Sequence, residues 1–258
     1  MTVLNLKRWA PAAAFALTTL LGSSVFAGEV TVAVASNFLK PFKQLVPVFQ
    51  KQSGHNVRTV SGSTGKLYAQ ILHGAPFDVF LAADSERPRL LETNGQAVPA
   101  TRFTYAQGKI VLWSADPRRI DSDGKSILQR RNFKHLALAN PKTAPYGKAA
   151  YTALARLNLW ESVSPTRVQG ENINQTFQFV ATGNAEIGFV ALSQVLDPHL
   201  KSKGSQWIVP EHLYETIDQD AVLLMRGQSQ PAAKALLQFL KSDTARKLIQ
   251  SYGYGLKE

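Results

Sequence analysis

The chain has 258 residues, of which 45% are hydrophobic, and its 29 Lys and Arg residues outnumber 18 Asp and Glu residues to give a formal net charge of +11. It contains no cysteine, which excludes disulfides, thiolate metal sites, thiol nucleophiles and a lipid-modified N-terminal cysteine. A strongly basic balance is typical of nucleic-acid binding. Here Lys and Arg form no run longer than two, so we expect no nucleic-acid partner and instead steering of an anionic ligand.

The first 27 residues predict a cleavable signal peptide. Lys7 and Arg8 precede an uncharged apolar run over residues 9–21, and residues 25–27 (VFA) fit a small-x-Ala cleavage site. The apolar run is shorter than the ~20 residues that span a bilayer, which disfavours the alternative of an uncleaved anchor. We therefore expect a mature protein that begins at Gly28 and lies free in a periplasm, since no lipid-anchoring cysteine follows.

Strand and helix patterns alternate through the first part of the mature chain. Short apolar, β-branched runs are followed by segments with helical spacing of apolar residues. This βαβαβ rhythm predicts a mostly parallel sheet with helices on its faces. In chain order the expected elements are strand 29–36, helix 38–52, strand 55–60, helix 66–73, strand 77–82 and helix 85–94.

The rhythm then restarts, which predicts a second α/β unit. Two such units in about 230 residues indicate two lobes of ordinary domain size. The last helix is expected to begin with Pro231 in its first turn and to end before Gly253. The expected elements are strands 109–113 and 136–139, helix 148–157, strand 166–169, helix 174–182, strands 187–191, 206–209 and 221–225, and helix 231–251.

Four strand-to-helix turns carry the same chemistry: residues 36–37 (SN), 61–65 (SGSTG), 145–147 (PYG) and 170–173 (GENI). Each places a hydroxyl, an amide or a bare glycine backbone at a helix N-terminus, where N–H groups are unpaired and partly positive. Ligands of open α/β sheets bind beyond the carboxyl ends of the strands, so four such turns that converge would bind an anion. Plain helix capping is the alternative for each turn taken singly.

The composition of these turns narrows the class of anion. A receptor for organic acids is expected to offer an Arg to the carboxylate, and none of the four turns contains one. Phosphate that keeps a proton favours an acceptor in the site, and Glu171 is the one carboxylate in these turns, so phosphate stays open. Neutral donors suit a fully deprotonated tetrahedral dianion, and sulfate differs from larger dianions mainly in size.

Seven short segments occur in a fixed order between Val30 and Gly255. They are 32–37 (VAVASN), 62–71 (GSTGKLYAQI), 74–84 (GAPFDVFLAAD), 140–141 (NP), 145–147 (PYG), 170–175 (GENINQ) and 187–190 (IGFV), of which 74–84 is the most specific. Together they resemble the periplasmic molybdate-binding proteins of ABC importers. The resemblance covers nearly the whole mature chain.

This resemblance implies the two-lobe, type II fold of periplasmic binding proteins, in which the lobes close on a ligand in the cleft between them. Lobe I is then expected at residues 28–106 plus 218–258, and lobe II at 107–217. The implied protein is a monomer with no cofactor and no enzymatic activity. It captures molybdate, and tungstate as well, for an ABC permease of the inner membrane.

The resemblance also implies the ligand-binding residues. Hydroxyl groups as well as backbone amides are expected from Ser36, Thr64 and Tyr146, and a backbone N–H from Ile173. The full implied set is Ser36, Asn37, Ser63, Thr64, Tyr146 and Ile173, with Ser63 as the secondary member. Some relatives carry a tyrosine where this chain has Ala191, so the phenol here is expected from Tyr146 alone.

An enzyme is the competing interpretation, because residues 63–66 (STGK) match the S-x-x-K motif of serine β-lactamases and penicillin-binding proteins. No S-D-N follows, and residues 142–144 (KTA) depart from K-T-G, so a binding protein is favoured. Lys66 either adds positive potential near the site or is solvated. We expect Asp84 to cap the helix that begins near Ser85, and Asp78 to order a turn.

Overall fold

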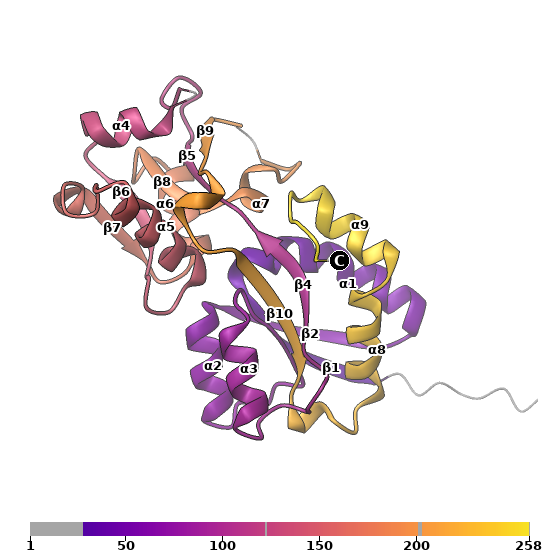
Figure 1. Cartoon of the computed structure of the whole chain (residues 1–258). Coiled ribbons are helices and arrows are strands. Elements are labelled where there is room, and N and C mark those ends of the chain that lie inside the picture. The colour runs from indigo at the N-terminus through magenta and orange to yellow at the C-terminus, as the bar shows by residue number, and fades with distance from the viewer. Residues whose placement is uncertain (1–27, 122, 201–202, 258) are drawn as a thin grey trace, which may run out of the picture.

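The computed structural model describes residues 28–121, 123–200 and 203–257, and the predicted signal peptide at 1–27 lies outside them. Two separate five-stranded sheets, each flanked by helices, form two lobes (Figure 1). The predicted two-lobe α/β fold is thereby confirmed. Among the described helices none is long and apolar enough to cross a membrane.

The first sheet has the strand order β2-β1-β3-β10-β4. β1 is parallel to β2 and β3, whereas β10 is antiparallel to both β3 and β4, so β10 alone runs against the other four strands. Its strands are β1 (Glu29–Ala35), β2 (Asn56–Gly62), β3 (Val79–Leu81), β4 (Phe103–Gly108) and β10 (Ile217–Leu223).

The second sheet repeats this arrangement in the order β7-β6-β8-β5-β9. β6 is parallel to β7 and β8, whereas β5 is antiparallel to both β8 and β9. Each sheet is therefore mostly parallel, as predicted. The strands are β5 (Ile110–Ser114), β6 (Leu136–Ala139), β7 (Arg167–Gly170), β8 (Ile187–Ala191) and β9 (Ser205–Ile208).

The chain crosses between the sheets twice. It passes from β4 to β5 through Lys109 and returns from β9 to β10 through residues 209–216. Strands of the first sheet thus occupy 29–108 and 217–223, and those of the second occupy 110–208. The lobe limits expected from the sequence, at 106 and 218, lie inside β4 and β10, next to these two crossings.

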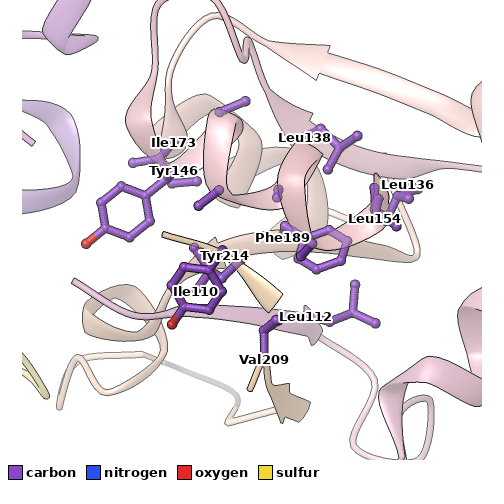
Figure 2. Packing of buried hydrophobic residues seen from close by; sticks show 14 of the residues in the cluster. Ile110, Leu112, Leu136, Leu138, Tyr146, Leu154, Ile173, Phe189, Val209 and Tyr214 are labelled. Carbon is purple, nitrogen blue, oxygen red and sulfur yellow. The ribbon is translucent and has the colours of Figure 1, made fainter. Parts of the chain in front are cut away.

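Both faces of each sheet are buried, as the continuous apolar character of the strands requires. In β1, Val30, Val32 and Val34 face the core shared with the C-terminal helices, and Ala33 faces the opposite core, as expected for side chains that alternate across a strand. A second pair of cores flanks the other sheet. Figure 2 shows the core around Leu112, Leu136 and Phe189.

The helices bury one apolar face each, and in the first of them Phe42, Leu45 and Phe49 provide that face. The α-helices are α1 (Leu39–Ser53), α2 (Thr64–Leu72), α3 (Glu86–Thr93), α4 (Gly124–Arg130), α5 (Pro145–Arg156), α6 (Ile173–Ala181), α7 (Leu192–Val195), α8 (Pro231–Leu240) and α9 (Asp243–Ser251). The 3-10 turns are η1 (Ser36–Phe38), η2 (Ser164–Thr166), η3 (Glu211–Leu213) and η4 (Met225–Gly227).

The predicted single C-terminal helix was wrong, because it is two helices. Ser242 adopts an extended backbone with ψ of 154°, and its hydroxyl accepts the N–H of Ala245 at 3.3 Å. A serine N-cap therefore starts α9 inside an otherwise helical pattern. The sequence analysis also missed β4, α4 and α7. These elements are short, and β4 mixes polar and apolar residues without a clear period.

Gly147 in the first turn of α5 is a glycine whose lack of a side chain allows close packing in the second lobe. A Cβ there would lie 2.3 Å from the carbonyl oxygen of Ala139 at the end of β6. We expect Gly147→Ala to lower the free energy of unfolding by about 1–3 kcal/mol, since backbone atoms must move apart. Gly62→Ala is the control, because its Cβ would meet only Leu67 at 3.5 Å. Urea denaturation measures both, and equal stability of the two variants would contradict the expectation.

Candidate anion-binding site

One small cavity between the lobes brings together all six residues expected at the ligand. Its volume is about 10 Å³, far below the ~300–1,000 Å³ typical of pockets for organic ligands. Its size therefore suits a small inorganic ion. The lining residues are Ala35, Ser36, Asn37, Ser63, Thr64, Ala83, Ala144, Pro145, Tyr146 and Ile173.

Helix N-termini supply nearly the whole lining. Ser63 and Thr64 begin α2, Ala144 to Tyr146 begin α5, and Ile173 begins α6, while residues 35–37 lead through η1 into α1. The first N–H groups of a helix have no acceptor within that helix. Together with the partial positive charge of each helix end, they form an electropositive site without any charged side chain.

The local sequence decides which N–H groups stay available. In α6 the Asn172 side chain accepts the N–H groups of Asn174 and Gln175 at 3.0 and 3.1 Å, which leaves the N–H of Ile173 without an intrahelical acceptor. In α5 the N-cap is Ala144, which offers no capping side chain, and Pro145 has no N–H. The N–H of Tyr146 is therefore the first donor of α5.

Three hydroxyl groups at the cavity can donate hydrogen bonds. The Thr64 hydroxyl accepts the N–H of Ala83 at 3.0 Å, so its own proton is free to donate toward an anion. The Ser63 hydroxyl is buried and has no hydrogen-bond partner. Ser36 is also buried and lines the cavity. A buried, unpartnered hydroxyl carries a free-energy penalty, which a bound acceptor would remove.

The described residues that line the cavity include no Asp, Glu, Lys or Arg. Glu171, the carboxylate of the fourth turn, pairs instead with Lys66 at 2.7 Å, and both side chains are at least half exposed. Lys66 therefore bridges the two lobes at the surface, and the cavity presents donors without an opposing carboxylate. A ligand that keeps a proton would find no carboxylate to accept it.

Asn37 and Tyr146 also form part of a buried polar network at the back of the cavity. The Asn37 amide nitrogen donates to Gln219 Oε1 at 2.6 Å and lies 3.4 Å from the Tyr146 hydroxyl, which is also 3.3 Å from Gln219 Nε2. Gly108 makes room for the phenol, since a Cβ there would lie 2.1 Å from its oxygen. Tyr146 therefore links the second lobe to β4 and β10 of the first. Figure 2 shows its ring beside Ile173.

Burial keeps the phenols of this network protonated. Desolvation raises the pKa of Tyr254 to about 12 and raises the pKa of Tyr146 well above its ordinary value, with a smaller contribution from the nearby Tyr254. Both hydroxyls therefore carry a proton throughout the physiological range and can act as hydrogen-bond donors.

Sequence analysis missed four residues that hold the site in place: Gln219, Ser193, Gln194 and Tyr254. Gln219 is fully buried in β10 between Asp218 and Asp220, and the strand expected at 221–225 did not include this polar run. Gln194 receives the Ala191 N–H at 3.0 Å and donates to the Ile173 carbonyl at 3.3 Å. It therefore ties the end of β8 to the first turn of α6.

The two lobes are in direct contact around the cavity. The N–H of Gly65 donates to the carbonyl of Thr143 at 2.8 Å, and Lys40 Nζ lies 2.5 Å from the Asp197 carboxylate. Desolvation by itself would raise the pKa of Asp197, but hydrogen bonds from Lys40 and from the His199 N–H outweigh it and hold the pKa below its ordinary value. The ion pair therefore stabilises the closed arrangement at neutral pH.

The expected serine–lysine pair of an S-x-x-K enzyme is not assembled. Ser63 lacks a hydrogen-bond partner, and Lys66 pairs with Glu171, so no base contacts the serine hydroxyl. In the described part of the chain, no three His, Asp or Glu side chains gather as a metal site would require.

The two aspartates of segment 74–84 have structural partners. Asp84 accepts the N–H of Arg87 at 2.9 Å in the first turn of α3, as expected for a capping residue. Asp78 is buried, accepts the N–H of Thr31 at 2.8 Å and pairs with Arg226. Asp78 thus ties β1 to the start of β3 and to η4, rather than ordering its own turn.

Two lobes that close on a small cavity of helix N-termini define a solute-binding protein. A family model described as bacterial extracellular solute-binding protein matches residues 30–255, and the chain belongs to this family.

Individual proteins are similar to this chain over nearly its whole length. The chain is 53% identical over 238 residues to the molybdate-binding protein ModA of Azotobacter vinelandii, covering 92% of this chain and 94% of the relative. It is 48% identical over 245 residues to ModA of Rhodobacter capsulatus, covering 95% of each. The solved structure of the Azotobacter vinelandii periplasmic molybdate-binding protein superimposes with a TM-score of 0.85 at 39% identity, covering 89% of this chain and all of that one.

The Lys40–Asp197 ion pair gives a testable pH dependence. Because the pKa of Asp197 is lowered in the folded protein, its stabilisation is complete above the ordinary carboxyl pKa and is lost as the pH falls through the lowered one. We expect Asp197→Asn to reduce the free energy of unfolding by about 1 kcal/mol at pH 7, the upper end for a pair with one exposed partner. The difference should shrink below about pH 4.

Glu211→Gln is the control, since Glu211 pairs with Lys109 but is largely exposed. Urea denaturation at pH 7, 5, 4 and 3 gives the free energy of unfolding of the unmodified protein, Asp197→Asn and Glu211→Gln. Identical stability of Asp197→Asn and the unmodified protein at pH 7 would contradict the assignment.

Proposed function

We propose that the protein captures molybdate, and also tungstate, in the periplasm and delivers it to an ABC importer. The observation that carries this proposal is the small cavity lined by neutral hydrogen-bond donors from both lobes. The molybdate-binding relatives at 53% and 48% identity over nearly the whole chain support the choice of ligand.

A tetrahedral oxyanion without protons matches this lining chemically. It offers acceptors on every side, and helix N–H groups and hydroxyls offer the donors. Each hydrogen bond to a charged group contributes ~1.5–3 kcal/mol net. Six such bonds exceed the ~8 kcal/mol of a micromolar complex even after the entropic costs of association are subtracted.

The proposed roles follow from the position of each residue. Hydroxyl and backbone N–H groups of Ser36 and Thr64 donate from lobe I, and the unpartnered Ser63 hydroxyl adds a further donor. Asn37 contributes its backbone N–H, since its side chain is bound to Gln219. From lobe II come the N–H groups of Tyr146 and Ile173.

The other features of the protein follow from the same proposal. The predicted signal peptide at 1–27 exports the chain, a monomer binds one anion between its lobes, and the protein acts by binding and release rather than by catalysis. Closure hides the anion and presents a defined surface of both lobes to the permease. The excess of positive charge raises the rate of encounter with the anion.

Calorimetric titration of the mature protein, Gly28 onward, tests the ligand. We expect one-to-one binding of molybdate and tungstate, with sulfate and phosphate at least a hundredfold weaker, because phosphate retains a proton and sulfate is too small to reach both lobes at once. Preferential binding of sulfate would reassign the ligand within the same class of anion. No heat from any of the four anions would overturn the oxyanion proposal.

Removal of one hydroxyl tests the donor set. Thr64→Ala deletes a donor whose acceptor position is already satisfied by Ala83, and we expect the Kd for molybdate to rise roughly tenfold to a hundredfold, as for one hydrogen bond to a charged group. The matched control is Thr93→Ala, whose exposed hydroxyl bonds only Arg89 within α3 and whose Kd should be unchanged. Equal affinities of the two variants would exclude Thr64 from the site.

A further inference from the structure

Tyr254, three residues beyond the last helix, places its hydroxyl between the two lobes. Its oxygen lies 3.0 Å from the carbonyl oxygen of Asn37, 3.1 Å from the Asn37 amide nitrogen and 3.0 Å from the Ser193 hydroxyl. Asn37 belongs to lobe I, and Ser193 belongs to α7 of lobe II. One buried phenol thus contacts both halves of the protein.

The position of Tyr254 is fixed independently of these contacts. Its neighbour Gly255 exchanges two backbone hydrogen bonds with Gln107 of β4, at 2.7 and 2.9 Å. The Tyr254 ring packs edge-on against Phe38, with ring centroids 5.6 Å apart. The hydroxyl is therefore held by lobe I, and its contacts with Ser193 and with the Tyr146 hydroxyl depend on the position of lobe II.

Asn37 is held by hydrogen-bond contacts at its backbone carbonyl and at its side-chain amide. Tyr254 reaches its backbone carbonyl and its side-chain amide, and the Ser193 hydroxyl lies 3.5 Å from the same carbonyl. These contacts orient the peptide groups of the turn that lines the anion cavity. Tyr254 does not line that cavity, so it acts on the ligand through Asn37.

The short helix α7 reaches the other half of the site. Gln194, next to Ser193, donates to the Ile173 carbonyl at 3.3 Å and to the Asn174 side chain at 2.7 Å. Ile173 begins α6 and lines the cavity from lobe II. Adjacent residues of α7 therefore hold the ligand-binding turns of both lobes, and Tyr254 completes the connection.

We propose that the Tyr254 hydroxyl, bonded to Ser193, is a closed-state latch that positions Asn37 and slows release of the bound anion without contacting it. This inference rests on the proposed function. When the lobes separate, the bond between Tyr254 and Ser193 breaks, and Ser193 no longer helps to orient Asn37. Affinity therefore depends on how far the latch favours the closed state.

The experiment compares the mature protein with Tyr254→Phe, Ser193→Ala and the double variant. Calorimetry gives the Kd for molybdate, and exchange of isotope-labelled molybdate gives the dissociation rate. We expect each single variant to raise the Kd roughly fivefold to tenfold, as for one net hydrogen bond, chiefly through faster dissociation. The double variant should resemble Tyr254→Phe, because that change already breaks the bond to Ser193 that Ser193→Ala removes.

Two control variants remove a hydrogen-bonded hydroxyl that stays within one lobe. Thr101→Ala loses bonds to the Val98 carbonyl and the Leu223 N–H in lobe I, and Ser205→Ala loses bonds to Asp116 and Ile120 in lobe II. Both should lower the melting temperature and leave the molybdate Kd unchanged. These controls distinguish the effect of losing the latch on the molybdate Kd from the effect of a general loss of stability.

The outcomes are distinct. Unchanged Kd and dissociation rate in Tyr254→Phe, beside an unmodified protein that binds molybdate, would overturn the latch alone. Additive effects of Tyr254→Phe and Ser193→Ala would also overturn it, since they would show two separate contributions. An unmodified protein that binds no molybdate would overturn the proposed ligand instead. Coupled loss of affinity with both control variants unaffected would establish the latch.

Discussion

The helix N–H groups that meet between the lobes impose the constraint on which the rest of the molecule depends. Buried donors must find acceptors, and at the starts of α2, α5 and α6 the helices themselves cannot supply them. The protein brings these ends together in a cavity of about 10 Å³ with three hydroxyls beside them. An anion with acceptors on all sides satisfies the donors, and it replaces its hydration shell with them. Closure of the lobes and binding of the anion are then one event.

In the proposed function, neutral donors give this site its selectivity. With no arginine or lysine in the lining, the favourable electrostatics come from fixed dipoles, which do not reorganise when the ligand enters. With no carboxylate in the lining, a proton on the ligand would face a donor. The charged pairs Lys40–Asp197 and Lys66–Glu171 lie outside the cavity, on the seam between the lobes. Charge thus helps to hold the lobes together, while the cavity itself recognises the ligand through hydrogen bonds.

In the polar network behind the cavity, the side chains of Asn37 and Tyr146 have a different role from their backbone groups. Asn37 and Tyr146 line the cavity, yet their side chains meet at Gln219, a fully buried residue of β10. The backbone N–H groups of these residues are thereby left for the ligand, and their side chains join the lobes. These contacts satisfy the polar groups that are buried between the lobes beside β4 and β10.

The sequence by itself determined the alternation of strands and helices, the two lobes and the four turns that face the ligand. These features depend on local patterns: apolar periodicity fixes the element type, and Ser, Thr, Asn and Pro mark helix starts. The break at Ser242 and the short elements β4, α4 and α7 could not be predicted, because their apolar periodicity and capping patterns are weak compared with those of the neighbouring segments. Only the tertiary structure decided that Tyr254, Ser193 and Gln219 meet at Asn37. Residues separated by as many as 217 positions are brought together by packing of the two lobes, and no spacing along the chain encodes that contact.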